Sequence, residues 1–323
     1  MLCMNPVDVI GDVHGCADKL TGLLRTLGYS EIGGTFRHPD RTAIFVGDLI
    51  DRGPQQVEVL SIARSMVEAG AAHVLMGNHE FNAVSYVTPD PSEPDTFMRP
   101  RTGPKGPKNR SQHAQFLRQI GEDSILHRET IGWFKTLPLY LDLGPIRVIH
   151  ACWHDASVKA MHDLCEPGRP LDDGFFVDAN RTDNPLYELI ETTLKGPEVA
   201  LGTYGPYLDK EGNVRSDARI RWWDTSATTL RELAEIPGGS LTPAGNPLPD
   251  LPDEPVASAT RFRYASKVPA FFGHYWFRGT PRVTGPTTSC LDYSAVAGGP
   301  LVAYRWEGED TLSDDHLVSF GEV

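Results

Sequence analysis

The chain has 323 residues, of which 40% are hydrophobic and 23% charged, and its formal net charge at pH 7 is −13. This composition is typical of one large globular domain, or of a domain that carries an insertion. The acidic balance argues against non-specific binding to nucleic acid or anionic membranes, which requires clustered Lys and Arg. No apolar stretch reaches the roughly 18–20 residues of a membrane span. Five scattered cysteines and a first segment unlike a signal peptide predict a cytoplasmic protein.

The first eighty residues alternate between short apolar runs and helical patterns. Apolar runs at 7–10, 42–46 and 73–76 predict strands, and each is followed by Gly and then Asp or Asn. Between them, residues 18–27 and 55–69 have apolar residues at helical spacing. This βαβαβ order predicts a parallel or mixed sheet that is covered by helices.

The next segment contains a long connection and more regular structure. Residues 88–108 are rich in Pro, Gly and charge, which predicts a surface loop. Residues 111–137 predict two helical pieces. The segments 139–142 and 146–149 flank a Leu-Gly-Pro turn, so they predict a hairpin that ends at His150.

Residues 155–267 have the weakest pattern, and we interpret them as an insertion or cap within a single domain spanning residues 1–323. Residues 186–194 predict a helix there, whereas residues 237–255 are too rich in Pro and Gly for regular structure. After the insertion, the apolar residues 269–272 predict a strand, and further strands are expected near 289–293, 301–306 and 316–320.

Five predicted strands end in residue types that commonly bind metal ions. These residues are Asp12, His14, Asp48, Asn78, His150 and His274. In open α/β sheets, ligands bind at the carboxyl ends of the strands, so we expect these side chains to lie together. Carboxylate, imidazole and amide ligands suit Mn, Fe or Zn better than metals that prefer thiolates. Because Asp48 can bridge two cations, the pattern predicts a site for two divalent ions that bind a phosphoryl group.

Three nearby residues are candidates for catalysis. Asp51 and His79 are spaced to form a carboxylate–imidazole pair, which would keep His79 protonated as a general acid for the leaving oxygen. Arg52 can bind phosphate oxygens through two parallel hydrogen bonds. The motifs contain no nucleophilic side chain with an activating base, so we expect no covalent phosphoenzyme.

Three sequence blocks resemble the signature of a known family. The blocks GDVHG (11–15), GDLIDRGP (47–54) and GNHE (77–80) are similar to those of the calcineurin-like metallophosphoesterases. More narrowly, they resemble the phosphoprotein-phosphatase branch and its bacterial relatives, the PrpE-like phosphatases and the dinucleoside-tetraphosphatases. Further along, HACWHD (150–155) and FFGHYW (271–276) occupy the places of the family's later metal-binding histidines.

The resemblance implies an α/β (α+β) fold, a four-layer αββα sandwich with an inserted cap. It also implies two ion sites, the first made by Asp12, His14 and Asp48 and the second by Asp48, Asn78, His150 and His274. The two divalent ions would be Mn, with Fe, Zn or Ni as alternatives.

The implied activity is that of a serine/threonine phosphatase-like hydrolase. A metal-bridging hydroxide would attack phosphorus, His79 and Asp51 would act as the catalytic pair, and Arg52 and Asn78 would bind the phosphate. The family also has a phosphate-binding arginine between its last two histidines, which makes Arg219 and Arg221 further candidates.

More than one function remains open from the sequence. Symmetrical diadenosine-tetraphosphatases tend to have a small residue at the place of Asp51, so Asp51 favours a phosphoprotein or a small phosphomonoester as substrate. A dinucleoside polyphosphate such as diadenosine tetraphosphate is the alternative, because the first block is similar in both bacterial groups. A catalytically inactive binding module is less favoured, since all expected ligands are present. The sequence leaves the oligomeric state open.

Some residues near the blocks have a second interpretation. His154 is a rival of His150 as a metal ligand. Trp276 and its neighbour Tyr275 could stack on an aromatic leaving group, although packing in the core is the simpler role. Asp292 and Tyr293 are expected to be ordinary strand residues.

Overall fold

The computed structural model describes residues 6–164, 169–209, 212–257 and 261–322. The chain divides into two compact units. The first consists of Met1–Lys195 and Lys267–Val323, and the second of Gly196–Ser266. Every predicted metal ligand belongs to the first unit. The expected cap at residues 155–267 stays a prediction.

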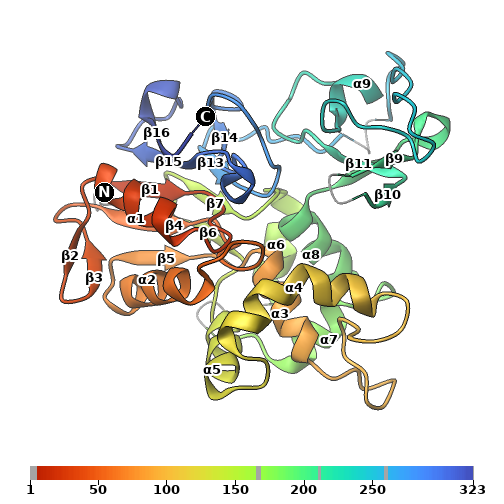
Figure 1. The fold of residues 1–323 in the computed structure, drawn as a ribbon. Helices are drawn as coiled ribbons and strands as arrows, with labels where there is room; N and C mark the ends of the chain where they lie inside the picture. Colours follow the sequence, from red (N-terminus) through yellow and green to blue (C-terminus); the bar gives the residue numbers. More distant parts are fainter. Residues whose placement is uncertain (1–5, 165–168, 210–211, 258–260, 323) are drawn as a thin grey trace. The chain divides into compact units, whose positions relative to one another are not determined.

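The first unit contains a five-stranded sheet with the strand order β16-β15-β1-β4-β5 (Figure 1). Its strands are β1 (Val7–Ile10), β4 (Thr42–Phe45), β5 (Ala72–Val74), β15 (Leu301–Trp306) and β16 (Leu317–Phe320). Strands β1, β4 and β5 are parallel, whereas β15 runs antiparallel to both β1 and β16. The sheet is therefore mixed, as the order of the sequence pattern predicted.

A second sheet in the same unit has the order β14-β13-β7-β6. Its strands are β6 (Tyr140–Asp142), β7 (Arg147–Ile149), β13 (Ala270–Phe272) and β14 (Thr288–Cys290). The antiparallel pair β6–β7 is the expected hairpin, and β7, β13 and β14 are parallel. A small hairpin of β2 (Ser30–Ile32) and β3 (Thr35–Arg37) had no counterpart in the prediction.

The hydrophobic core lies between the two sheets. One buried cluster contains Val9 of β1, Ile44 of β4 and Tyr304 of β15 together with Val148 of β7 and Phe271 of β13. Because these strands have both faces covered, their sequences are almost continuously apolar, which made them visible as apolar runs. The polar residues that follow these buried strands lie at the end of the sheet.

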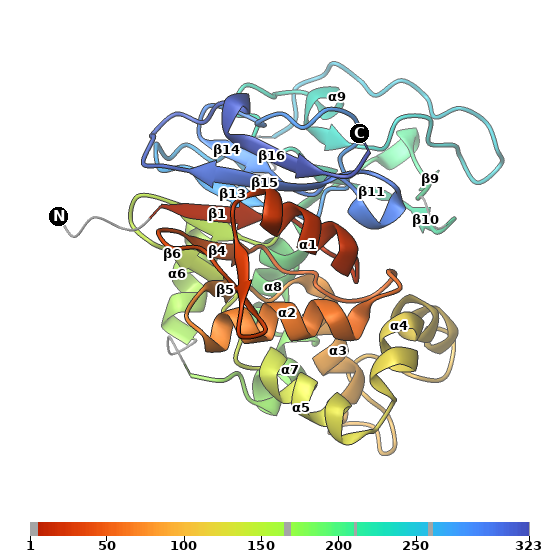
Figure 2. The ribbon, with the colours of Figure 1, turned by 60° about the vertical axis from the view of Figure 1, so that its left-hand side comes forward.

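Helices cover the outer faces of the two sheets (Figures 1 and 2). On the five-stranded sheet, α1 (Ala17–Thr26) packs on β15 and β16, and α2 (Gln56–Glu68) packs on β5. On the four-stranded sheet, Tyr140 of β6 contacts His162 of α6 (Asp155–Leu164) at 3.3 Å. Ala151, just after β7, donates to the carbonyl of Thr193 in α8 (Pro185–Lys195) at 3.0 Å. The predicted four-layer αββα arrangement is confirmed.

Further helices pack together beside the sheets. They are α3 (Asn78–Val87), α4 (Gly106–Ile120), α5 (Ile125–Phe134) and α7 (Asp173–Ala179). Helix α3 contacts α5 and α7, and α4 contacts α2 and α5. The loop expected at 88–108 ends slightly earlier, because Pro107 fits the first turn of α4. Within the described residues, every helix is too short or too polar to span a lipid bilayer.

The expectation that Asp292 and Tyr293 are strand residues is wrong. Strand β14 ends at Cys290, and the chain then turns. The buried carboxylate of Asp292 accepts hydrogen bonds from the backbone N–H groups of Trp276, at 2.7 Å, and Ser294, at 2.9 Å. Ser294 has a φ of 57°, so these bonds hold a turn rather than an extended strand.

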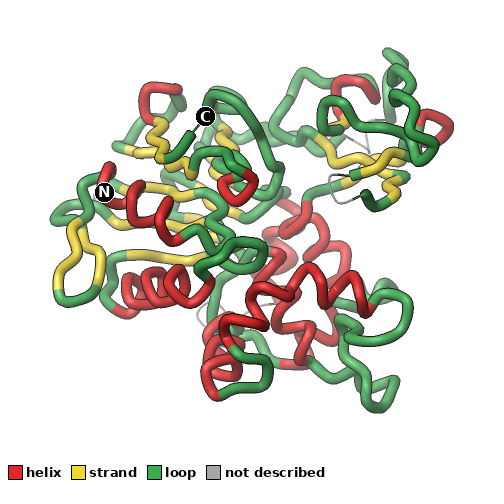
Figure 3. Tube along the Cα trace, in the orientation of Figure 1, coloured by secondary structure: helices red, strands yellow, loops and turns green. Residues whose placement is uncertain are grey.

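The second unit has little regular structure (Figure 3). It contains the sheet β12-β11-β8, the pair β9–β10 and a short helix. Their bounds are β8 (Glu198–Ala200), β9 (Tyr207–Leu208), β10 (Val214–Arg215), β11 (Asp217–Ile220), α9 (Leu230–Leu233) and β12 (Ala234–Glu235). Trp222 is buried in this unit against Tyr264, with ring centroids 5.8 Å apart.

Candidate metal centre

Six predicted ligands lie just after strands or at the start of a helix in the first unit. Asp12 and His14 follow β1, Asp48 follows β4, His150 follows β7 and His274 follows β13, while Asn78 begins α3. The structure joins Asp48 with His14 and His79 in one cluster and with His150 and His274 in a second, whereas the predicted ligand Asp12 belongs to neither cluster. Within each cluster, the candidate ligand atoms all lie within 4.8 Å of one another. Asp48 belongs to both clusters, as expected for a bridging carboxylate.

Backbone carbonyl groups fix the orientation of two histidines in these clusters. Nδ1 of His14 donates to the carbonyl of Ile50 at 2.8 Å, and Nδ1 of His150 donates to the carbonyl of Val46 at 3.0 Å. A carbonyl oxygen can only accept, so the proton of each neutral ring is on Nδ1 and the lone pair is on Nε2. Both Nε2 atoms face Asp48, at 3.6 Å and 3.4 Å from Oδ2. Histidine ligands are commonly held in this way.

The arrangement of acceptor atoms fits a cation. Nε2 of His150 lies 3.1 Å from Oδ1 of Asn78 as well as 3.4 Å from Oδ2 of Asp48. With Nδ1 protonated, this nitrogen and both oxygens would present lone pairs to one another, which is unfavourable unless a cation lies among them. Nearby, Oδ1 of Asp12 is buried, and in the described part of the chain it has no hydrogen-bond partner. Oxygen and imidazole ligands suit divalent Mn, Fe or Zn.

The charges of the centre perturb one another strongly. Burial, assisted by Asp292, raises the pKa of Asp12 well above its usual range. Burial and the guanidinium of Arg52 lower the pKa of His14 to about 3. Burial also opposes the charged form of His150, but the carboxylate of Asp48 raises the pKa of His150 to about 9. The acceptor atoms around Nε2 of His150 therefore favour a positive charge at this place.

The backbone of the centre is unusually strained. Among the described residues outside glycine, nine have a positive φ, and six of them lie at this centre. These six are His14 (44°), Asp48 (50°), Asp51 (69°), Arg52 (69°), His274 (75°) and Trp276 (55°). Side chains make this conformation costly, so such residues persist only where their surroundings hold them, and they often mark functional sites.

Hydrogen bonds to Glu80 and close packing around two glycines hold this strained backbone. The buried carboxylate of Glu80 accepts from the backbone N–H groups of Asp48, Leu49 and Gly77, at 2.9, 2.8 and 2.9 Å. It thereby joins the loop after β4 to the start of α3. Glycine is required at Gly77 and at Gly273, because a Cβ atom there would overlap Oδ1 of Asp48 and Oδ1 of Asp12, respectively.

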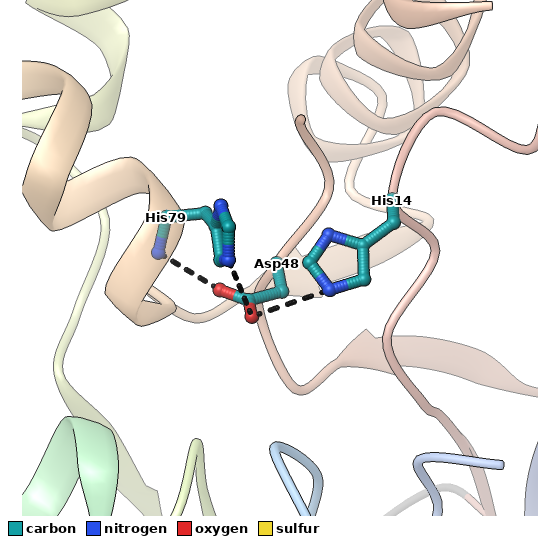
Figure 4. Close-up of side chains that lie close together, drawn as sticks. All are labelled: His14, Asp48 and His79. Atoms are coloured by element: carbon teal, nitrogen blue, oxygen red, sulfur yellow. Dashed lines mark hydrogen bonds and ion pairs between the residues drawn. The ribbon is translucent and has the colours of Figure 1, made fainter. Parts of the chain in front are cut away.

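The carboxylate of Asp51 lies beside His79. Nδ1 of His79 donates to Oδ2 of Asp51 at 2.6 Å, and both side chains are buried. The backbone N–H of His79 donates to Oδ1 of Asp48 at 2.9 Å, and Nε2 lies 3.9 Å from Oδ2 of Asp48 (Figure 4). His79 thus directs Nε2 toward the metal clusters and Nδ1 toward Asp51, a geometry suited to a proton donor.

Arg52 lies across the same centre. Its Nη1 is 3.3 Å from Nε2 of His14, and its Cζ lies 4.1 Å from the ring centroid of Trp276. Nε2 of His14 is the atom that would bind a metal ion, so the guanidinium must withdraw from it when an ion binds. Trp276 can keep the guanidinium close through the cation–π contact.

The remaining candidates have other surroundings. His154 lies outside both clusters, and its Nδ1 contacts Oγ of Ser157 at 2.7 Å. Arg219 and Arg221 belong to the second unit, where Arg221 pairs with Glu235 at 2.5 Å. Their role as phosphate ligands stays a prediction.

Sequence reasoning missed three residues of this region. Glu80 was in the third block but had no assigned role. Asp292 was assigned to a strand, and only Cys290 and Leu291 before it are apolar, so no apolar run marked it as a polar residue after a strand. His113 of α4 donates from Nδ1 to Oδ1 of Asp51 at 2.7 Å. A single histidine on the apolar face of a helix gives no signal that separates it from a core residue.

The family model for calcineurin-like phosphoesterases matches residues 6–234, and the chain belongs to this family. Three curated relatives are bis(5'-nucleosyl)-tetraphosphatases PrpE [asymmetrical]. The protein from Halalkalibacterium halodurans is 49% identical over 73 residues, 22% of this chain and 30% of that protein. The one from Bacillus subtilis is 39% identical over 149 residues, 45% of this chain and 56% of that protein. The one from Oceanobacillus iheyensis is 33% identical over 147 residues, 45% and 54% of the two chains. The chain thus matches between about a third and just over half of the length of these relatives.

Solved structures with a similar fold include two phosphatases. A protein serine/threonine phosphatase from Saccharomyces cerevisiae has a TM-score of 0.48 at 14% identity, covering 99% of this chain and 80% of that one. A cold-active protein-tyrosine phosphatase from a Shewanella species has a TM-score of 0.45 at 15% identity, covering 98% and 80%. Both TM-scores are below 0.5, so these similarities add nothing to the assignment of the family.

Proposed function

We propose that this chain is a dinuclear-metal hydrolase of phosphoric esters. The observation that carries the proposal is the pair of buried ligand clusters that share Asp48, with the Asp51–His79 pair at their edge. Two divalent ions close together can bind oxygens of a phosphoryl group and lower the pKa of a bound water. A site without catalytic metals would gain nothing from collecting these acceptor atoms in a buried place.

The residues that would hold the ions are those that the family resemblance implies, and four of them, His14, Asp48, His150 and His274, belong to the two clusters. Asp12, His14 and Asp48 would bind one ion, and Asp48, Asn78, His150 and His274 would bind the other. The family resemblance favours Mn, and imidazole and oxygen ligands also suit the alternatives Fe, Zn and Ni. The carbonyl bonds of His14 and His150 keep each Nε2 available, so the chain offers these atoms without rearranging its rings.

His79 would supply the proton for the leaving oxygen. Its Nδ1 bond to Asp51 fixes the ring, so the second proton of the imidazolium is on Nε2, which faces the centre. Although burial favours the neutral acid, the bonds from His113 and His79 hold the pKa of Asp51 well below its usual range. An ionised Asp51 accepts the hydrogen bond from Nδ1 of His79 and holds the ring in the orientation that a general acid requires. Arg52 would bind the phosphate oxygens, because its planar group can donate two parallel hydrogen bonds.

Two substrate classes are supported. The presence of Asp51 favours a phosphoprotein or a small phosphomonoester, by the family resemblance. The names of the curated relatives favour a bis(5'-nucleosyl) tetraphosphate cleaved asymmetrically, with similarity that extends over 149 residues to the Bacillus subtilis protein. Both reactions need the same attack on phosphorus and the same protonated leaving oxygen. We also propose that residues 155–267 contribute to substrate choice, with Arg219 and Arg221 as candidate phosphate ligands.

A side-by-side assay of the full chain tests the proposal. Protein loaded with Mn²⁺ is given a phosphoserine peptide, p-nitrophenyl phosphate and diadenosine tetraphosphate, and phosphate or nucleotide products are measured. We expect metal-dependent turnover of at least one substrate, and two unequal nucleotides from the tetraphosphate if that class is correct. No turnover of any of them, together with fewer than about one bound ion per chain, would support a binding module instead. A cytoplasmic location is retained as a prediction.

A further inference from the structure

The carboxylate of Asp51 is shared between two imidazole rings. Oδ2 accepts from Nδ1 of His79 at 2.6 Å, and Oδ1 accepts from Nδ1 of His113 at 2.7 Å. All three side chains are less than a tenth exposed. Each carboxylate oxygen therefore has one strong hydrogen bond from a ring, and the two bonds together define the rotation of the carboxylate plane.

His113 is itself held rigidly on α4. Its ring stacks on Phe116, with centroids 4.7 Å apart and planes at 30°, and Tyr86 packs at 5.4 Å. In the described part of the chain, Nε2 of His113 is buried without a hydrogen-bond partner. The polar contact of this ring is thus the donation from Nδ1 to Asp51, and the aromatic neighbours fix the direction of that donation.

Helix α4 also supports the backbone that carries Asp51. The backbone of Asp51 has the strained φ of 69°, and its N–H donates to Oε1 of Gln56 at 2.8 Å. Nε2 of Gln56 donates to the carbonyl of Gly53 at 2.7 Å, and the backbone N–H of Gln56 donates to Oε1 of Gln119 on α4 at 2.8 Å. The helix therefore holds the loop through Gln119 and the carboxylate through His113.

We propose that His113 is a positioning residue for the general acid: by bonding Oδ1 of Asp51, it keeps Oδ2 aligned with His79. This inference rests on the proposed phosphoesterase function. Without the bond, Oδ1 would be a buried carboxylate oxygen lacking its donor, and rotation of the carboxylate would weaken the bond to His79. Arg99 interacts electrostatically with Asp51. However, its guanidinium donates to Asn82 and Gln112, so it does not replace the hydrogen bond from His113 to Oδ1 of Asp51.

The test compares three variants of the full metal-loaded chain. His113→Phe keeps an aromatic ring and removes the donor, whereas His113→Asn places an amide N–H near the position of Nδ1. His127→Phe is the matched control, because His127 is buried against the same Phe116, at 5.7 Å, and its Nδ1 accepts from the N–H of Asp123. Rates are measured on p-nitrophenyl phosphate, which has a good leaving group, and on phenyl phosphate, which needs a proton donor.

A positioning role predicts a loss that depends on the leaving group. A general acid accelerates the reaction by roughly 10²–10⁴-fold, and a misaligned acid should lose part of this acceleration. We therefore expect kcat of His113→Phe on phenyl phosphate to fall about 10-fold or more. On p-nitrophenyl phosphate it should fall less than about 3-fold, with KM and metal content unchanged. His113→Asn should recover most of the loss, and His127→Phe should show no dependence on the leaving group. In a protein that already carries Asp51→Asn, His113→Phe should lower kcat on phenyl phosphate little further.

Other results would overturn the inference. Equal losses on both substrates, or no recovery in His113→Asn, would mean that His113 contributes only to packing. If the phenylalanine variant does not fold, His113→Gln replaces it, because its amide lies one bond further out and cannot reproduce the Nδ1 position. An equal activity of His113→Gln and His113→Asn on phenyl phosphate would then reject the role. Failure of the proposed function is a separate outcome, since the wild type itself would turn over neither ester.

Discussion

Replacing Asp48 by Asn should remove a large pH dependence from the stability of the metal-free protein. Asp48 and His150 are both fully buried, with Oδ2 and Nε2 3.4 Å apart. Although burial opposes it, the carboxylate raises the pKa of His150 from 6.5 to about 9. At about 1.36 kcal/mol per pKa unit, this shift corresponds to roughly 3 kcal/mol.

The direction follows from the protons bound in each state. Between pH 6.5 and 9 the folded protein keeps the proton on His150 while the unfolded chain has released it. The folded state then binds more protons, so the free energy of unfolding falls as pH rises. The stabilisation is fully present below pH 6.5 and is lost above about pH 9. In Asp48→Asn, the buried ring has no carboxylate beside it to favour its charged form. The change in the free energy of unfolding between pH 6.5 and 9.5 should therefore shrink to less than about 1 kcal/mol.

Urea unfolding of protein dialysed against a chelator measures this effect. The free energy of unfolding is compared at pH 6.5 and pH 9.5 for the wild type, Asp48→Asn and the control Asp310→Asn, whose side chain is exposed. We expect a loss of roughly 3 kcal/mol in the wild type and in the control. Parallel pH profiles in the wild type and Asp48→Asn would refute the argument, because the pair would then not control the proton on His150.

Three further variants test other parts of the centre. His79→Asn keeps an N–H toward Asp51 but loses the proton donor, so both ions should stay bound while the rate on phenyl phosphate falls about 10²-fold and that on p-nitrophenyl phosphate much less. Arg52→Lys should raise KM about 10-fold, because an ammonium group neither binds phosphate bidentately nor stacks on Trp276 in the same way. Gly273→Ala forces a methyl group against Asp12, which should lower the stability by about 1–3 kcal/mol and reduce the metal content, measured by elemental analysis.

The sequence was most informative where strands are buried on both faces. Strands β1, β4, β13 and β15 are mostly apolar, and the polar residue after each of β1, β4 and β13 is then conspicuous. The spacing of Asp48, His150 and His274 along the chain does not predict how close their side chains lie in the folded protein. Their convergence was predictable only because parallel strands present their carboxyl ends at one edge.

The parts that were missed have weaker local signals. His113 lies on the same buried face of α4 as Phe116, Leu117 and Ile120, so only the fold reveals that it reaches Asp51. Asp292 lies in a turn whose left-handed Ser294 has no marker such as glycine in the sequence. The described strands of the second unit have only two to four residues, too few for an alternating pattern to be recognised.

The proposed reaction requires two ions bound around Asp48. Metal-free wild-type protein is titrated with Mn²⁺ while bound metal and hydrolysis of p-nitrophenyl phosphate are followed together. We predict that activity rises to a plateau at about two ions per chain and that Asp48→Asn binds fewer ions and stays inactive. Full activity with one ion or none, or an unchanged titration in Asp48→Asn, would contradict the assignment of a dinuclear centre.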